Sequence, residues 1–170
     1  MILRSDITIN GILHRKGSYL SPWSIYPFFL LHMLMFGGSG FAMAYFSDDT
    51  PLGFLYLHGG IAIFVYAMFY ISIFGVDQVK WLIINSLTGI LGIYAEVDLM
   101  LSYLGKDILS FPIQVHVIPF TYYVMYTFLI RQAILDFSGA NEKPEIRERV
   151  ETLFVVFSLA VYACLYFYKG

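Results

Sequence analysis

Residues 52–75, LGFLYLHGGIAIFVYAMFYISIFG, decide the fold of this chain. The stretch contains no Asp, Glu, Lys or Arg, and a helix needs about 20 mostly apolar residues to cross the hydrocarbon core of a bilayer. Its apolar residues are continuous rather than alternating, which favours a transmembrane helix over a strand of a membrane barrel. Residues 52–75 therefore predict a helix that spans a membrane.

Four further apolar segments flank this stretch, so five transmembrane helices are predicted in total. The other four run from about Trp23 to Phe46, Val79 to Leu104, Pro112 to Leu135 and Glu151 to Tyr168. Short, turn-like connections such as 47–51 and 75–78 separate the segments. Connections this short place consecutive helices side by side and antiparallel. The predicted fold class is an all-α, polytopic membrane bundle.

The composition is typical of a membrane protein, so the lipid bilayer is a predicted partner. Of 170 residues, 59% are hydrophobic and 13% charged, whereas soluble domains are about 45–50% apolar and about 25% charged. A net charge of −2 without a basic block predicts no nucleic-acid partner. The lone cysteine, Cys164, has no partner for an internal disulfide, which excludes two-cysteine redox chemistry in a monomer.

Lysine and arginine are distributed unevenly between the two ends of the predicted helices. With a cytoplasmic N-terminus, two basic residues, Lys106 and Lys169, lie on the outer side and eight on the inner side. The eight are Arg4, Arg15, Lys16, Lys80, Arg131, Lys143, Arg147 and Arg149. The positive-inside rule then predicts the N-terminus inside and the C-terminus outside, as five spans require. We expect the bacterial or archaeal inner (plasma) membrane.

Two parts of the chain are distinguished. Residues 1–22 form a cytoplasmic segment, in which Asn10-Gly11 between two short apolar runs is typical of a type I′ hairpin. Residues 23–170 form a single transmembrane bundle with a charged cytoplasmic loop at 136–150. Within that loop, the stretch that ends at Pro144 is typical of a cap that leads into an extended fifth helix.

Small residues predict close helix packing in the third span. Ser86, Gly89, Gly92 and Ala95 recur every three residues, and small side chains let helix backbones approach closely. Five helices also enclose little interior. Together these features predict a homo-oligomer or a subunit of a larger membrane complex.

Ionisable side chains inside a span are costly, so each is a functional candidate by default, and four of them matter most here: His58, Glu96, Asp98 and His116. Counted at 1.5 Å per residue from the outer helix ends, His58 is about 9 Å deep and His116 about 6 Å deep. Glu96 lies about eight residues and Asp98 about six residues below the outer end of the third span. All four are therefore predicted in the outer third of the membrane.

Three kinds of chemistry fit these side chains. His58 and His116 have the donor type that binds a b-type haem between two helices. With Glu96 they form a donor set suited to a transition metal. Glu96 and Asp98 are candidates for a proton relay, with the deeper Glu96 as the titrating group, because the two point about 200° apart around the helix. Pairing across helices without chemistry is the structural alternative.

Ser39 raises a separate candidate. It lies in a Gly37–Gly40 stretch with the G-x-S-G string in which intramembrane serine proteases place their nucleophile. That reaction needs a histidine within hydrogen-bond reach, and His116 reaches Ser39 only if the estimated depths shift. Small residues for helix contact explain the string more simply.

The sequence thus favours a metal- or haem-binding redox subunit in electron transport. The alternatives are a proton- or ion-coupled small transporter that uses Glu96 and a non-catalytic subunit of a larger complex. No motif assigns an enzymatic reaction.

Overall fold

The computed structural model describes residues 2–9, 11–47, 49–78 and 80–169. It is 79% helical, which confirms the all-α fold. Within the described residues, five helices are long and apolar enough to cross a membrane, as predicted, and they fit an integral membrane protein. These are α1 (Pro22–Tyr45), α2 (Leu52–Phe74), the span Ile84–Tyr103, α5 (Ile113–Phe137) and α6 (Pro144–Lys169).

The third span is one continuous helix with a widened turn in its second half. It consists of α3 (Lys80–Gly92), the π-helical segment η2 (Ile93–Val97) and α4 (Asp98–Tyr103). Each extra residue in a helical turn rotates everything beyond it by about 100°. The π turn therefore changes the direction of the residues around Glu96 from that expected for a regular helix.

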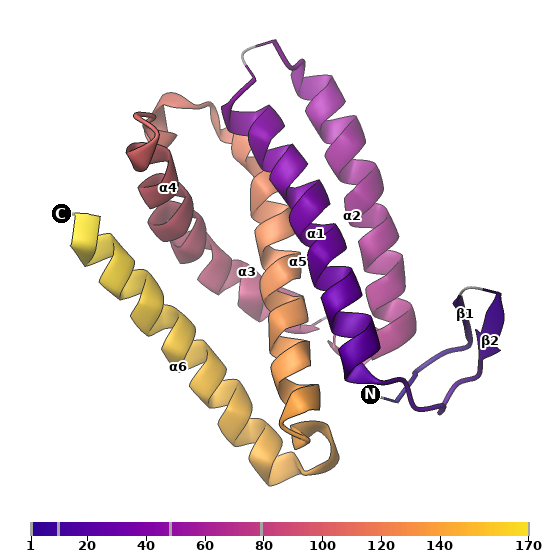
Figure 1. Cartoon of the computed structure of the whole chain (residues 1–170). Helices are drawn as coiled ribbons and strands as arrows, with labels where there is room; N and C mark the ends of the chain where they lie inside the picture. The colour runs from indigo at the N-terminus through magenta and orange to yellow at the C-terminus, as the bar shows by residue number, and fades with distance from the viewer. Residues whose placement is uncertain (1, 10, 48, 79, 170) are drawn as a thin grey trace.

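The helices surround a central pair, α1 and α5, which lie side by side along their length (Figure 1). On one side α2 packs against this pair, and on the other side α3 packs against α5. Three short 3-10 segments, η1 (Val76–Gln78), η3 (Ile108–Ser110) and η4 (Ala140–Glu142), belong to the connections. The fifth helix begins at Pro144, as the loop sequence predicts.

Helix α6 lies at the edge of the bundle, where it contacts α3, η2 and α5. It starts beside the end of α5 and diverges from it, so that its last turn lies near α4 (Figure 1). Among the described side chains of α6, Tyr162 alone is buried, with 6% exposed. One face of α6, which includes Phe154, Val155 and Val161, is half-buried along the helix, and the other faces are exposed.

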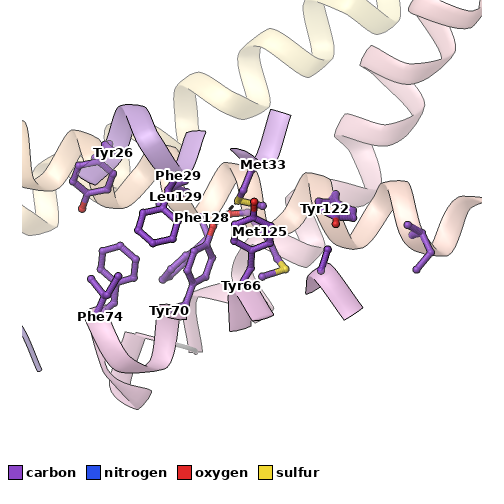
Figure 2. Packing of buried hydrophobic residues seen from close by; sticks show 14 of the residues in the cluster. Tyr26, Phe29, Met33, Tyr66, Tyr70, Phe74, Tyr122, Met125, Phe128 and Leu129 are labelled. Atoms are coloured by element: carbon purple, nitrogen blue, oxygen red, sulfur yellow. Dashed lines mark hydrogen bonds between the residues drawn. The ribbon is translucent and has the colours of Figure 1, made fainter. Parts of the chain in front are cut away.

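Aromatic and sulfur-containing side chains of α1, α2 and α5 form the core (Figure 2). The buried Tyr70 hydroxyl lies 2.8 Å from the sulfur of Met33 and 3.1 Å from the carbonyl oxygen of Met125. A buried hydroxyl needs such a partner, because leaving it unpaired costs free energy. Tyr70 of α2 therefore links α1 to α5 in the middle of the bundle.

The small-residue stripe of the third span contacts α5 of the same chain. A Cβ added at Gly89 would stand 3.1 Å from a methyl carbon of Val124, so the two backbones approach closely. The stripe therefore serves packing within the chain. The predicted oligomer stays a prediction.

The N-terminal segment is a hairpin tied to one end of the bundle. Strand β1 (Ile7–Ile9) pairs antiparallel with β2 (Ile12–His14) at the predicted position, although Asn10 of the turn lies outside the described residues. The Ser5 hydroxyl donates to the carbonyl oxygen of Ser72 at 2.6 Å. Leu3, 1% exposed, anchors the segment in the core.

Candidate functional site

The predicted site residues contact three different groups of partners. Nε2 of His58, on α2, lies 3.0 Å from the Ser39 hydroxyl of α1. Nδ1 of His116, on α5, lies 2.8 Å from the Tyr45 hydroxyl of α1. Ser39 and Tyr45 are six residues apart, which is about 9 Å along α1. The two histidine contacts are therefore further apart in depth than the sequence estimate places them.

Glu96 lies at a third position. Its partner is Tyr123 of α5, which is seven residues, or about 10 Å, deeper along that helix than His116. Among the described residues, no group of three His, Cys, Asp or Glu side chains is arranged to hold a metal ion. The structure thus does not gather His58, Glu96 and His116, because each side chain turns to a hydroxyl group at its own level. The metal and haem assignments remain predictions.

The Glu96 position is a built contact between three helices. The Tyr123 hydroxyl of α5 lies 2.5 Å from the Tyr162 hydroxyl of α6. The Glu96 carboxyl group lies close enough to both tyrosines to interact with them electrostatically. Glu96, Tyr123 and Tyr162, called the Glu96 site below, thus form a polar cluster contributed by η2, α5 and α6.

Two backbone features make room for the Glu96 site. A Cβ at Gly92 would overlap the Tyr123 hydroxyl group, so the absence of a side chain there makes room for the tyrosine. The π turn of η2 begins at the next residue and carries Glu96. π turns inside helices frequently occur at functional sites, because they re-aim side chains at the cost of regular hydrogen bonding.

The carboxyl group lies well inside the span. Glu96 is seven residues, or about 10 Å, from the end of the helix at Tyr103. Its side chain is nevertheless exposed on the surface of the single chain, beside α6. Asp98, the other predicted relay residue, is half-buried at the first turn of α4.

The contact between His58 and Ser39 does not by itself make an activated nucleophile. The Ser39 hydroxyl has one proton and two acceptors within reach, the carbonyl oxygen of Phe36 at 2.8 Å and Nε2 of His58. The carbonyl oxygen therefore competes with the imidazole for the proton that a general base would have to remove. His58, rather than His116, is the histidine within reach, and the contact links α1 to α2.

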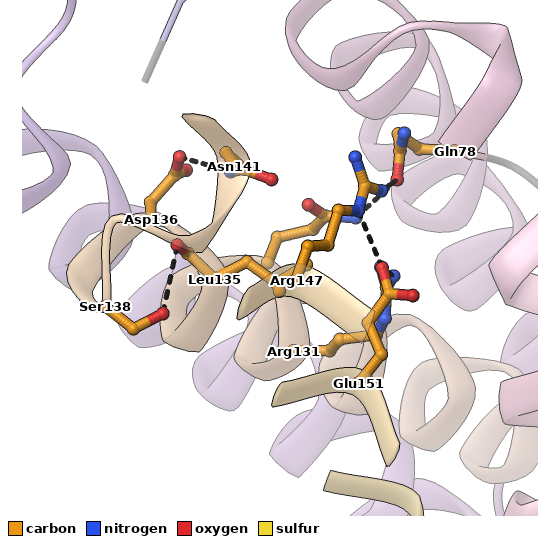
Figure 3. A network of polar contacts seen from close by, with 9 residues as sticks. Gln78, Arg131, Leu135, Asp136, Ser138, Asn141, Arg147 and Glu151 are labelled. Atoms are coloured by element: carbon orange, nitrogen blue, oxygen red, sulfur yellow. Dashed lines mark hydrogen bonds and ion pairs between the residues drawn. The ribbon is translucent and has the colours of Figure 1, made fainter. Parts of the chain in front are cut away.

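A charged network at the other end of the bundle was not expected from the sequence (Figure 3). Arg131 of α5 is 1% exposed, forms an ion pair with Glu151 of α6, and stacks 3.6 Å over the ring of Trp81. Arg147 binds the same carboxylate at 2.8 Å and donates to Gln78 at 2.8 Å. The network joins α3, η1, α5 and α6 near the predicted cytoplasmic surface.

A signal for this network does exist in the sequence. Helix α5 continues six residues beyond Arg131 to Phe137, and the apolar stretches 128–130 and 133–135 lie on either side of the arginine. A cation between apolar stretches of a span is expected to pair with a counter-ion from a neighbouring helix. In the comparison of Lys and Arg between the two sides of the membrane, Arg131 counts only as a charge at the inner surface.

No family model matches the chain, and no curated protein or solved structure resembles it at a significant level.

Proposed function

We propose that the protein is a small membrane transporter that translocates protons, with Glu96 as the group that takes up and releases them. The observation that carries the proposal is the polar cluster of Glu96, Tyr123 and Tyr162 at the edge of the bundle, in which the two tyrosine hydroxyl groups are hydrogen-bonded. Ionisable groups within a span are rare, and carboxylates there commonly serve proton relays in pumps and transporters.

The chemical groups of the Glu96 site favour protons over metal ions as the transported species. Each phenol group can accept one hydrogen bond and donate another, so a proton can pass along two neighbouring hydroxyl groups. One carboxylate and two phenols provide too few oxygen ligands for the six to eight that Ca²⁺ prefers. Protonation also removes the charge of Glu96, which lowers the cost of keeping the carboxyl group away from water.

The placement at the edge of the bundle supports exchange of the proton. Glu96 remains exposed beside α6, and α6 contributes Tyr162 as its single buried side chain among those described. A carboxyl group in a fully closed core would have no route for a proton. The same group at the exposed edge of the bundle can be reached by water.

The test is proton flux into liposomes that contain the purified protein and a pH-sensitive dye. A potassium diffusion potential set with valinomycin drives the protons. We expect Glu96→Gln to lower the flux at least about tenfold, and Tyr123→Phe to lower it less, because water can replace one hydroxyl group. Glu148→Gln, an exposed carboxylate of α6, is the matched control and keeps wild-type flux.

Two outcomes contradict the proposal. One is wild-type flux no greater than that of protein-free liposomes. The other is a Glu96→Gln variant that folds and transports protons as fast as the wild type.

A further inference from the structure

A polar pocket lies at the end of the bundle opposite the Glu96 site, where the N-terminal segment meets the ends of α2, α5 and α6. Its volume is about 110 Å³. One water molecule needs about 10–15 Å³ of such space, so the pocket holds several waters or one small polar group. The polar side chains in its wall are Arg4, Gln78, Gln132, Asp136, Asn141 and Arg147.

The one carboxylate in the wall is already engaged. Asp136 accepts hydrogen bonds from the Tyr26 hydroxyl and from the Asn141 amide, the latter at 2.6 Å. Arg147 uses two of its nitrogen atoms to bind Glu151 and Gln78. Its remaining terminal nitrogen stays available to a ligand.

Arg4 is the uncompensated cation of the pocket. In the part of the chain that the structure describes, its guanidinium forms no ion pair or side-chain hydrogen bond. Its aliphatic stem lies against Gly75, where an added Cβ would stand 3.3 Å from the Cγ of Arg4. Beside it, the Gln132 amide is buried, with 2% exposed.

We propose that this pocket, named the Arg4 pocket, binds a phosphate ester, with the headgroup phosphate of an anionic lipid as the ligand. Guanidinium groups bind phosphate oxygens through paired, charge-assisted hydrogen bonds. Basic pockets between transmembrane helices on the cytoplasmic side bind anionic headgroups for the same reason. The Arg4 pocket lies at the end of the bundle that the positive-inside rule places in the cytoplasm. The proposal does not depend on the Glu96 site.

The experiment measures the melting temperature of the full-length protein in detergent with three additives. These are phosphatidic acid, phosphatidylcholine with the same acyl chains, and inorganic phosphate. Because a ligand that binds only the folded state stabilises it, we expect phosphatidic acid to raise the melting temperature by about 3 °C or more at saturation. Phosphatidylcholine gives no more than a third of that shift.

Three variants locate the effect. Arg4→Gln loses the shift, and Arg4→Lys keeps part of it, which separates charge from packing of the stem. Arg15→Gln removes an exposed arginine of the same segment outside the pocket and keeps the full shift. A shift of equal size with inorganic phosphate, also lost in Arg4→Gln, supports the phosphate site and assigns it to a soluble ester.

Three results overturn the proposal. The first is full retention of the melting-temperature shift in Arg4→Gln. The second is a loss of that shift in Arg15→Gln as large as the loss in Arg4→Gln. The third is a phosphatidylcholine shift as large as that of phosphatidic acid.

Discussion

At the scale of single residues, Gly92 shows how a missing side chain creates room for a polar contact. The Tyr123 hydroxyl group occupies the space that a Cβ would fill, and from there it meets both Glu96 and Tyr162. A glycine in a helix interior costs free energy relative to alanine. Here the contact that the glycine admits offsets that cost.

Replacement of Gly92 by alanine should push Tyr123 away and strain the packing of α3 against α5. Overpacking of this kind typically destabilises a protein by about 1–3 kcal/mol. We expect a lower melting temperature and a lower proton flux. Gly60→Ala is the control, because nothing lies within 4 Å of a Cβ there. Equal melting temperatures of Gly92→Ala and wild type would show that Tyr123 has another position available.

The two histidines give a prediction about cofactors. A haem held by His58 and His116 requires both imidazoles to turn toward one ring. In the structure they instead contact the hydroxyl groups of Ser39 and Tyr45. We expect purified protein to show no Soret band and no stoichiometric transition metal. A Soret band that His58→Ala abolishes would restore the haem assignment.

At the scale of elements, α6 depends on the ion pairs of its first turns. Glu151 neutralises both Arg131 and Arg147. Removal of one partner from a buried ion pair leaves an uncompensated charge and typically costs about 3–5 kcal/mol. Glu151 is 15% exposed, which moderates this cost.

Glu151→Gln should therefore destabilise the protein by about 2–3 kcal/mol and detach the start of α6. Trp81, which stacks on the Arg131 guanidinium, provides the measurement through its fluorescence during thermal unfolding. Glu145→Gln, an exposed carboxylate at the start of α6, should leave the transition unchanged. Identical transitions for the two variants would mean that the pair contributes nothing to stability.

The elements themselves follow from the sequence, whereas the contacts between them do not. Long apolar runs predict the five spans, and the stretch before Pro144 predicts the start of α6. The cost of a carboxylate in a bilayer points to Glu96. The π turn at 93–97 and the partner Tyr162 were missed, because both depend on how neighbouring helices rotate and pack. A hydropathy pattern contains no information about that rotation.

At the scale of the whole molecule, orientation in the membrane remains a prediction that labelling can test. In a Cys164→Ala background, single cysteines replace Asp49, in the α1–α2 connection, and Glu145, at the start of α6. Because of the positive-inside bias, a membrane-impermeant maleimide added to intact cells should label position 49. Position 145 should react only after permeabilisation. The reverse pattern would establish the inverted orientation.

The position of α6 at the edge of the bundle has a consequence for the proposed function. Polar contacts tie the helix to the bundle at Glu151 and again at the Tyr162 hydroxyl, about eleven residues, or roughly 16 Å, farther along. If Glu96 takes up and releases protons as proposed, each change of its charge alters the electrostatic environment of Tyr162. The packing of the second half of α6 would then respond to the charge on one carboxyl group.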